Sequence, residues 1–124
     1  MAYDPNNVFA RILRGEIATK KVFEDDHVLA FHDIAQLAPI HVLVIPKGPY
    51  RTMDEFTAHA SDAALASFVR ALGKIAQITG VAETGYRLIA NCGADARQEV
   101  PHLHMHLVGG RELGPMLRKP KTEG

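Results

Sequence analysis

The sequence has one cysteine, no excess of either charge and no long apolar run, and each shortage excludes a class of protein. Because Cys92 stands alone, no internal disulfide can form, and we expect a protein of the reducing cytoplasm. Lys plus Arg number 14, as do Asp plus Glu, so the chain lacks the broad positive surface that binds nucleic acids or acidic membranes. No stretch approaches the ~20 apolar residues of a membrane span, and residues 1–5 lack the pattern of a signal peptide.

The 124 residues, 47% of them hydrophobic, are enough for one compact domain. Apolar spacing predicts a short helix over residues 7–14 and a long helix that begins at Ser61 and ends near Gly80. The buried stripe of the long helix is expected to be Leu65, Phe68, Val69, Leu72, Ile75 and Ala76. Strands are predicted over residues 21–24, 28–33, 39–46, 86–91 and 102–108. The expected fold is α+β, with an antiparallel five-stranded sheet and the long helix on one face.

Three histidines alternate with apolar residues near the end of the chain: His102, His104 and His106. In a strand they would share one face, with neighbours ~7 Å apart, while the apolar residues between them pack under the long helix. Imidazole titrates near neutral pH, so such a cluster can hold a neutral nucleophile beside protonated neighbours. That combination suits attack on an anionic phosphorus centre.

Two other interpretations of the histidines remain open at this point. The first is a solvated strand face that carries histidines without a chemical role. The second is a metal site, because His-x-His on a strand is a common ligand pair and Asp95 and Glu99 offer carboxylates nearby.

Residues 101–110, PHLHMHLVGG, resemble the signature of the histidine-triad superfamily. Three further blocks agree: LAFHDI at residues 29–34, APIHVLVIPK at 38–47 and GYRLIAN at 85–91. Over about residues 4 to 111, their order and spacing resemble the nucleotide-binding branch of that superfamily. The branches of galactose-1-phosphate uridylyltransferases and of dinucleotide hydrolases fit less well. The resemblance implies one domain at residues 1–111, followed by an irregular tail at 112–124.

This resemblance implies a hydrolase of nucleoside 5′-phosphoramidates that acts on purine nucleotides without a metal or other cofactor. His104 is the implied nucleophile, which forms a nucleotidyl-histidine intermediate, and His106 contacts the phosphate or the leaving group. His102 and His41 are implied to form a supporting relay behind the nucleophile, although a histidine such as His41 on an apolar strand is equally explained as a core residue. The alternatives are a dinucleoside polyphosphate hydrolase and a nucleotide-binding regulator with vestigial turnover.

The resemblance also implies a set of nucleotide-binding residues. Asp33 is expected to accept hydrogen bonds from both ribose hydroxyls, since a carboxylate offers two oxygens to a cis-diol. Asn91 and Gln98 are expected to donate to the phosphate. The other implied binding residues are His32, Leu43 and the apolar base wall of Phe9, Ile12, Phe31 and Ile34. Taken singly, each of these apolar residues is better explained as core.

Two residues depart from the branch pattern in the loop between Asn91 and Pro101, which we call the phosphate loop. Arg97 stands where Gly is common, and Glu99 stands where Ser or Thr usually donates a hydroxyl hydrogen. An ionised Glu can only accept, so these departures bear on the leaving group rather than on the nucleophile. The family protein is a homodimer, which implies an interface made by the long helix and the strand at residues 86–91. No nucleic acid or membrane partner is expected.

Overall fold

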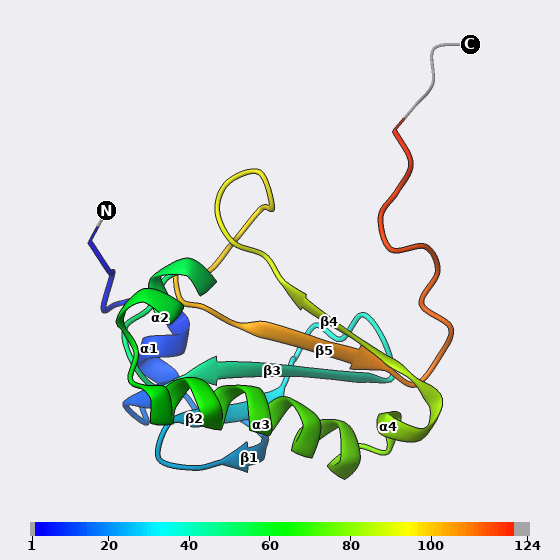
Figure 1. Cartoon of the computed structure of the whole chain (residues 1–124), viewed down its shortest axis with the longest axis horizontal. Helices are drawn as coiled ribbons and strands as arrows, with labels where there is room; N and C mark the ends of the chain where they lie inside the picture. Colours follow the sequence, from blue (N-terminus) through cyan, green and yellow to red (C-terminus); the bar gives the residue numbers. More distant parts are fainter. Residues whose placement is uncertain (1, 121–124) are drawn as a thin grey trace.

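A five-stranded antiparallel sheet in the order β1-β2-β3-β5-β4 forms the centre of the fold (Figure 1). The computed structural model describes residues 2–120, so Met1 of the predicted domain and residues 121–124 of the predicted tail lie outside it. The strands are β1 Lys21–Glu24, β2 Val28–His32, β3 Ile40–Pro46, β4 Tyr86–Ala90 and β5 Met105–Gly109. The helices are α1 Val8–Leu13, α2 Met53–His59, α3 Asp62–Ile78 and α4 Val81–Thr84. The predicted α+β fold is confirmed.

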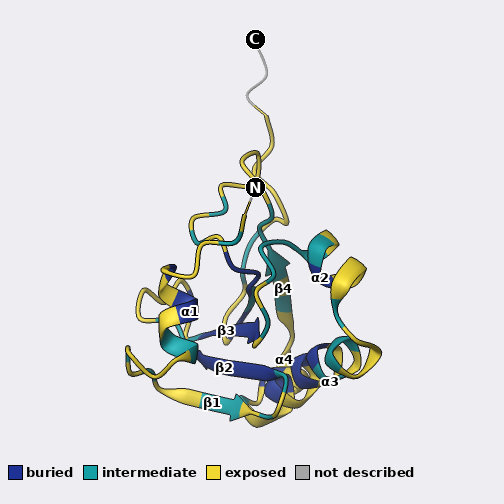
Figure 2. Ribbon diagram, turned by 90° about the vertical axis from the view of Figure 1, so that its left-hand side faces the viewer, coloured by how far each residue is buried: buried dark blue, intermediate teal, exposed yellow. Residues whose placement is uncertain are grey.

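The two faces of the sheet are covered unequally. Figure 2 shows α1 and α3 on opposite sides of the strands. Alternate residues of β2 separate accordingly, because Val28 and Ala30 join the core cluster under α3 while Leu29 and Phe31 pack with Phe9 of α1. Since α1 has only six residues, it leaves much of its own face of the sheet open. That open face carries the site described below.

The long helix α3 begins and ends where the sequence predicts. The Ser61 hydroxyl accepts a hydrogen bond from the Ala64 amide at 3.1 Å, and Gly80 follows the helix at a φ of +83°. Of the predicted stripe, Leu65 is half-buried, Phe68, Leu72, Ile75 and Ala76 are buried, and Val69 was wrongly included. Val69 is 66% exposed because it lies on the flank of the helix and not over the sheet.

Two short helices were not predicted. Helix α2 follows a capping signal, because the Thr52 side chain accepts from the Glu55 amide in a Thr-x-x-Glu pattern. Helix α4 is a single turn between Gly80 and Gly85, both at positive φ. None of the helices in the described part of the chain has the length and apolar character needed to cross a membrane.

The last strand starts later than predicted, and this leaves both His102 and His104 outside the sheet. The ladder between β3 and β5 ends at the pair Val44↔Met105. Before it, Pro101 has no N–H to donate and the Leu103 amide donates to the Tyr50 carbonyl at 2.8 Å instead of to a strand. The prediction of one strand face carrying all three imidazoles is therefore wrong. The predicted packing of Leu103 and Leu107 on the α3 side is confirmed.

Candidate active site

A cleft opens on the α1 face of the sheet and gathers residues that are far apart in the sequence. Its walls come from α1, from the end of β2 and the loop after it, from β3, from residues 91–100 and from β5. It is lined by every predicted site residue except His102 and Gln98. The cleft thus joins a group of imidazoles to an apolar wall that includes Phe9, Ile12 and Leu43.

His104 lies in this cleft as a neutral imidazole with one nitrogen free. Its Nδ1 is 2.8 Å from the carbonyl oxygen of His102, and a carbonyl only accepts, so Nδ1 carries the hydrogen. Burial lowers the pKa of His104, while the bond to His102 and the charges of Asp33 and Glu99 oppose that shift. The Phe9 ring packs against the imidazole edge to face, with centroids 4.9 Å apart. The lone pair of a neutral His104 is therefore on Nε2, which is the state that a nucleophile requires.

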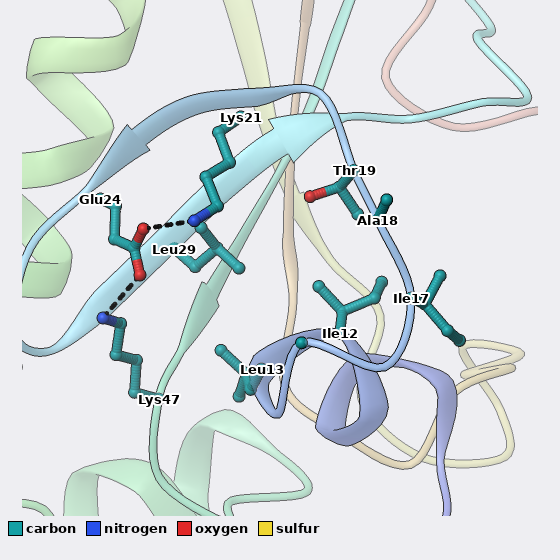
Figure 3. Close-up of a pocket in the computed structure, with 10 residues that line it drawn as sticks. Ile12, Leu13, Ile17, Ala18, Thr19, Lys21, Glu24, Leu29 and Lys47 are labelled. Carbon is teal, nitrogen blue, oxygen red and sulfur yellow. Dashed lines mark hydrogen bonds and ion pairs between the residues drawn. The ribbon is translucent and has the colours of Figure 1, made fainter.

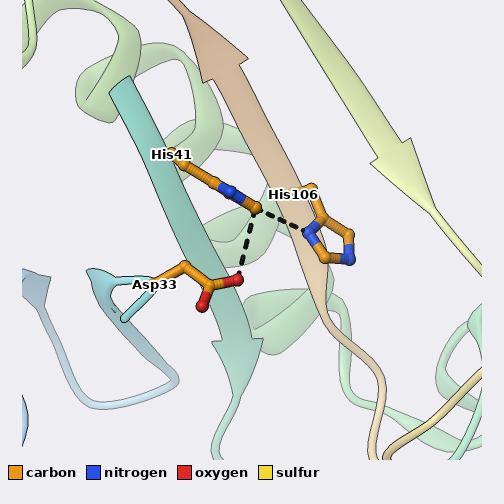
Figure 4. Close-up of side chains that lie close together, drawn as sticks. All are labelled: Asp33, His41 and His106. Atoms are coloured by element: carbon orange, nitrogen blue, oxygen red, sulfur yellow. Dashed lines mark hydrogen bonds and ion pairs between the residues drawn. The ribbon is translucent and has the colours of Figure 1, made fainter. Parts of the chain in front are cut away.

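His41 and His106 form a hydrogen-bonded pair beside His104. The Leu37 amide donates to Nδ1 of His41 at 3.1 Å, so the His41 hydrogen is on Nε2. This Nε2 lies 2.9 Å from Nδ1 of His106 and 3.4 Å from Oδ2 of Asp33 (Figure 4). His106 therefore accepts at Nδ1 and keeps a hydrogen on Nε2. The predicted relay of His41 with His102 is wrong, because His41 contacts His106 instead.

Burial keeps this pair uncharged at neutral pH. It lowers the pKa of His106 to about 4, with the charges of His104 and His41 adding to the shift and Asp33 opposing it. Burial also lowers the pKa of His41, which is only 1% exposed, and Asp33 again opposes the shift. A neutral His106 in this tautomer can donate a hydrogen bond from Nε2 to a phosphoryl oxygen or a leaving group.

His102 is fully buried behind the cleft. Its Nε2 lies 2.9 Å from the Pro46 carbonyl and its Nδ1 lies 2.7 Å from the hydroxyl of Tyr3. Burial lowers the pKa of His102 to about 4, opposed by the bond to Pro46. Tyr3 was not predicted as a site residue, because it is separated from its partner by 99 positions and belongs to no motif. With His102 0% exposed and His104 7% exposed, the interpretation as a solvated strand face is wrong.

A metal ion is the other chemistry that this cluster suggests. Asp33, His41 and His106 each offer one ligand atom, all within 4.8 Å of one another, and the set would suit Zn²⁺. Ligation through Nε2 of His41 would require the hydrogen on Nδ1, where it would face the Leu37 N–H at 3.1 Å. Two donors would then oppose each other, so the arrangement favours a chain of hydrogen bonds over a metal centre. The carboxylates that the sequence suggested, Asp95 and Glu99, do not join this cluster.

The predicted binding residues fall into distinct environments. Asp33 lines the cleft with one oxygen toward His41, while its other oxygen accepts from the Ala35 amide at 2.9 Å. Phe31 and Leu43 are buried with Phe9, whereas Ile34 is fully exposed at the mouth of the cleft. The expected base wall is thus partly core and partly open surface.

The phosphate loop differs from expectation at one residue. Gln98 does not reach the cleft, because its amide donates to the carbonyls of Arg51 and Val100 and its oxygen accepts from the Gly93 amide. The prediction that Gln98 donates to a phosphate is therefore wrong. Arg97 lines the cleft at a φ of +56°, the left-handed region that glycine adopts without strain, which accounts physically for the preference for glycine at this position. Glu99 also lines the cleft and is exposed.

A second hollow lies between α1, residues 15–19 and the β1–β2 hairpin and is a weaker candidate (Figure 3). Its charged groups are Glu24 and two lysines, Lys21 and Lys47, each with its Nζ 2.8 Å from an oxygen of Glu24. Their hydrogen bonds and charges lower the pKa of the Glu24 carboxyl to about 2. Glu24 offsets one of the two positive charges, and the residues that line the hollow include no histidine. We therefore assign the chemistry to the cleft that contains His104.

Comparison of the sequence with known proteins identifies closely similar chains. The HIT domain family matches residues 14–113. An uncharacterized 13.2 kDa HIT-like protein of Azospirillum brasilense is 62% identical over 117 residues, which cover 94% of this chain and 96% of that protein. The purine nucleoside phosphoramidase of Escherichia coli (strain K12) is 46% identical over 110 residues, which cover 89% of this chain and 92% of the relative.

Comparison of the fold with solved structures gives the same result. A HIT family hydrolase from Clostridium thermocellum matches with a TM-score of 0.82 and 43% identity, covering 91% of this chain and 97% of the other. A histidine triad protein from Clostridium difficile matches with a TM-score of 0.80 and 38% identity, covering 94% of this chain and 100% of the other.

Proposed function

The chain belongs to the HIT domain family, and we propose that it hydrolyses nucleoside 5′-phosphoramidates and related purine nucleotide conjugates. The observation that carries this proposal is the 2.8 Å contact between Nδ1 of His104 and the His102 carbonyl oxygen, from which the tautomer of His104 follows. Its Nδ1 hydrogen is held by the His102 carbonyl, which leaves a nucleophilic Nε2 in an open cleft. The similarity to a purine nucleoside phosphoramidase supports the choice of substrate class.

In the proposed first step, Nε2 of His104 attacks the α-phosphorus and the bond from phosphorus to the leaving nitrogen breaks. The nitrogen takes up a proton from solvent water and departs as an amine. His104 then carries the nucleotidyl group on Nε2 and a positive charge, which the His102 carbonyl stabilises through the 2.8 Å bond at Nδ1. Asp33 and Glu99 favour the same charge, since both raise the pKa of this imidazole.

In the proposed second step, water attacks the same phosphorus, loses a proton to the solvent and displaces His104, which releases a nucleoside monophosphate. Division of one displacement into two easier ones is the usual gain from covalent catalysis. The Nε2 hydrogen of His106, held outward by His41, is proposed to stabilise the phosphoryl oxygens or the leaving group. Asp33 is proposed to bind the ribose, Asn91 the phosphate and the apolar wall the base.

A steady-state assay with an adenosine phosphoramidate, after exhaustive chelation, tests the function. We expect turnover that survives chelation, because the proposed steps use only side chains. Absence of turnover above buffer at micromolar enzyme would favour a nucleotide-binding regulator. Activity that returns only with added zinc would contradict the metal-free mechanism. Preference for a dinucleoside polyphosphate over the phosphoramidate would favour the alternative function of a dinucleoside polyphosphate hydrolase.

Glu99 is expected to set the charge preference for the leaving group. An exposed carboxylate on the cleft wall repels anions, so amines that carry a further positive charge should be preferred over phosphate-bearing leaving groups. Glu99→Ser should raise kcat/KM for anionic relative to cationic leaving groups by a few-fold, or about 1 kcal/mol of differential transition-state binding. Glu83→Ser on α4 is the matched control, because Glu83 is exposed and does not line the cleft. An unchanged ratio in Glu99→Ser would show that this carboxylate has no part in selection.

A homodimer is part of the proposal. Strand β4 is an edge of the sheet, and Tyr86 and Leu88 on it are 42% and 40% exposed. Val69 of α3 is exposed as well. An unpaired edge with apolar side chains is a surface that proteins usually cover. We propose that the β4 strands of two chains pair at this edge. We also propose that residues 1–111 form the domain and that residues 112–124 form a tail. Sedimentation equilibrium checks the proposed dimer, and the mass of a single 13.6 kDa chain would contradict it.

A further inference from the structure

The segment before α1 reaches the histidine triad from outside the region that matches the family. Tyr3 places its hydroxyl 2.7 Å from Nδ1 of His102, and the two rings meet edge to face with centroids 5.7 Å apart. The family match begins at residue 14, so this contact comes from a part of the chain that the match does not cover.

The segment is held in place by buried polar contacts. Asn7 is 6% exposed, and its side-chain oxygen accepts from the Ala10 amide at 2.9 Å, which caps α1. Its side-chain nitrogen donates to the Asp4 carbonyl at 2.7 Å. The residues around Tyr3 are thereby fixed to the same helix that places Phe9 against His104.

The direction of the hydrogen bond between Tyr3 and His102 follows from the second contact of the ring. Nε2 of His102 faces the Pro46 carbonyl, which only accepts, so the ring hydrogen is on Nε2. Nδ1 of the neutral ring is then a lone pair, and the Tyr3 hydroxyl must donate to it. His102 is 0% exposed, so without that hydroxyl the nitrogen would be a buried acceptor with no partner among the described residues.

The residue that Tyr3 holds is the residue that sets the tautomer of His104. The carbonyl of His102 accepts the Nδ1 hydrogen of His104 at 2.8 Å. We propose that Tyr3 is a positioning residue for the nucleophile, because it fixes His102, whose carbonyl holds His104 in the tautomer that attacks. This inference rests on the proposed function, in which His104 is the nucleophile.

Tyr3→Phe tests the proposal, with Tyr50→Phe as the matched control, because the Tyr50 ring packs against Phe56 and does not line the cleft. Tyr3→Phe should lower kcat for the phosphoramidate about tenfold, the effect of losing one well-placed hydrogen bond, with little change in KM. KM is spared because Tyr3 does not line the cleft. Tyr50→Phe should leave both constants near those of the unchanged protein. Equal kcat in Tyr3→Phe and Tyr50→Phe would overturn the proposal.

A spectroscopic measurement on the protein without substrate separates this inference from the proposed function. Imidazole ¹⁵N chemical shifts should show the Nδ1–H tautomer for His104 and the Nε2–H tautomer for His102. In Tyr3→Phe, His104 should become a mixture of tautomers. These spectra test the inference even if no phosphoramidate is turned over, in which case only the proposed function fails. An Nδ1–H signal of His104 that is unchanged in Tyr3→Phe would overturn the inference while leaving the function intact.

Discussion

Replacement of His104 with alanine should reduce turnover by at least about 10⁴-fold while leaving the affinity for nucleoside monophosphate within a few-fold of its original value. The loss is large because no other described imidazole combines a place on the cleft wall with an Nδ1 hydrogen held by a carbonyl. Affinity persists because the apolar wall and Asp33 are unchanged. Single-turnover kinetics and calorimetric titration with adenosine monophosphate measure the two quantities.

His102→Ala is the informative comparison for this prediction. It removes a buried ring but keeps the backbone carbonyl that holds His104, so the loss of turnover should be clearly smaller. The exposed His59 lies on α2, and His59→Ala serves as the control for a histidine outside the site. Equal losses in His104→Ala and His102→Ala would contradict the assignment of the nucleophile.

Acid should destabilise the fold through His102 well above the pH at which most carboxylates titrate. The pKa of His102 falls from 6.5 in an unfolded chain to about 4 in the fold, because burial disfavours the charged ring. Well above pH 6.5 neither state binds the proton. As the pH falls below 6.5, the unfolded chain binds a proton that the fold does not, so stability is lost until the pH reaches about 4. At pH 5 the loss from this one group is about 2 kcal/mol.

Urea unfolding at pH 7 and pH 5 measures that loss, and His102→Gln isolates the contribution of His102. The variant cannot take up the proton, so its free energy of unfolding should fall by about 2 kcal/mol less between the two pH values. For each protein, the free energy of unfolding at pH 5 is subtracted from that at pH 7. The destabilisation caused by altering a buried side chain is present at both pH values and therefore cancels. An equal pH difference in the variant and the unchanged protein would show that His102 is not the group responsible.

The elements with strong local patterns were predictable from the sequence. Ser61 and Gly80 delimit α3 because a cap and a left-handed glycine act within one turn of the chain. Strands β2 and β3 were predictable as apolar runs, because their residues are buried on both faces of the sheet. The late start of β5 was not predictable, because it depends on contacts of residues 102 and 103 with Pro46 and Tyr50, which no local pattern encodes.

The residues that form the site could be predicted from the sequence, but the hydrogen bonds between them could not. The histidine motif and the resemblance identified the residues that line the cleft, since those residues lie in contiguous blocks. Which imidazole pairs with which depends on the register of β3 against β5, where Leu43 lies opposite His106. That register brings His41 to His106, whereas the sequence suggested a pair with His102. Gln98 was misplaced for a related reason, because its amide completes its hydrogen bonds within its own loop and with Arg51.

The proposed covalent nucleotidyl intermediate on His104 can be detected by rapid quenching followed by peptide mass spectrometry. An adenosine phosphoramidate is mixed with the enzyme, the reaction is stopped within a single turnover, and the peptides are sequenced. We predict one adenylyl group on the peptide that contains His104, at that residue, and none on His104→Ala. Turnover at full rate with no adduct, or an adduct on His106, would contradict this prediction.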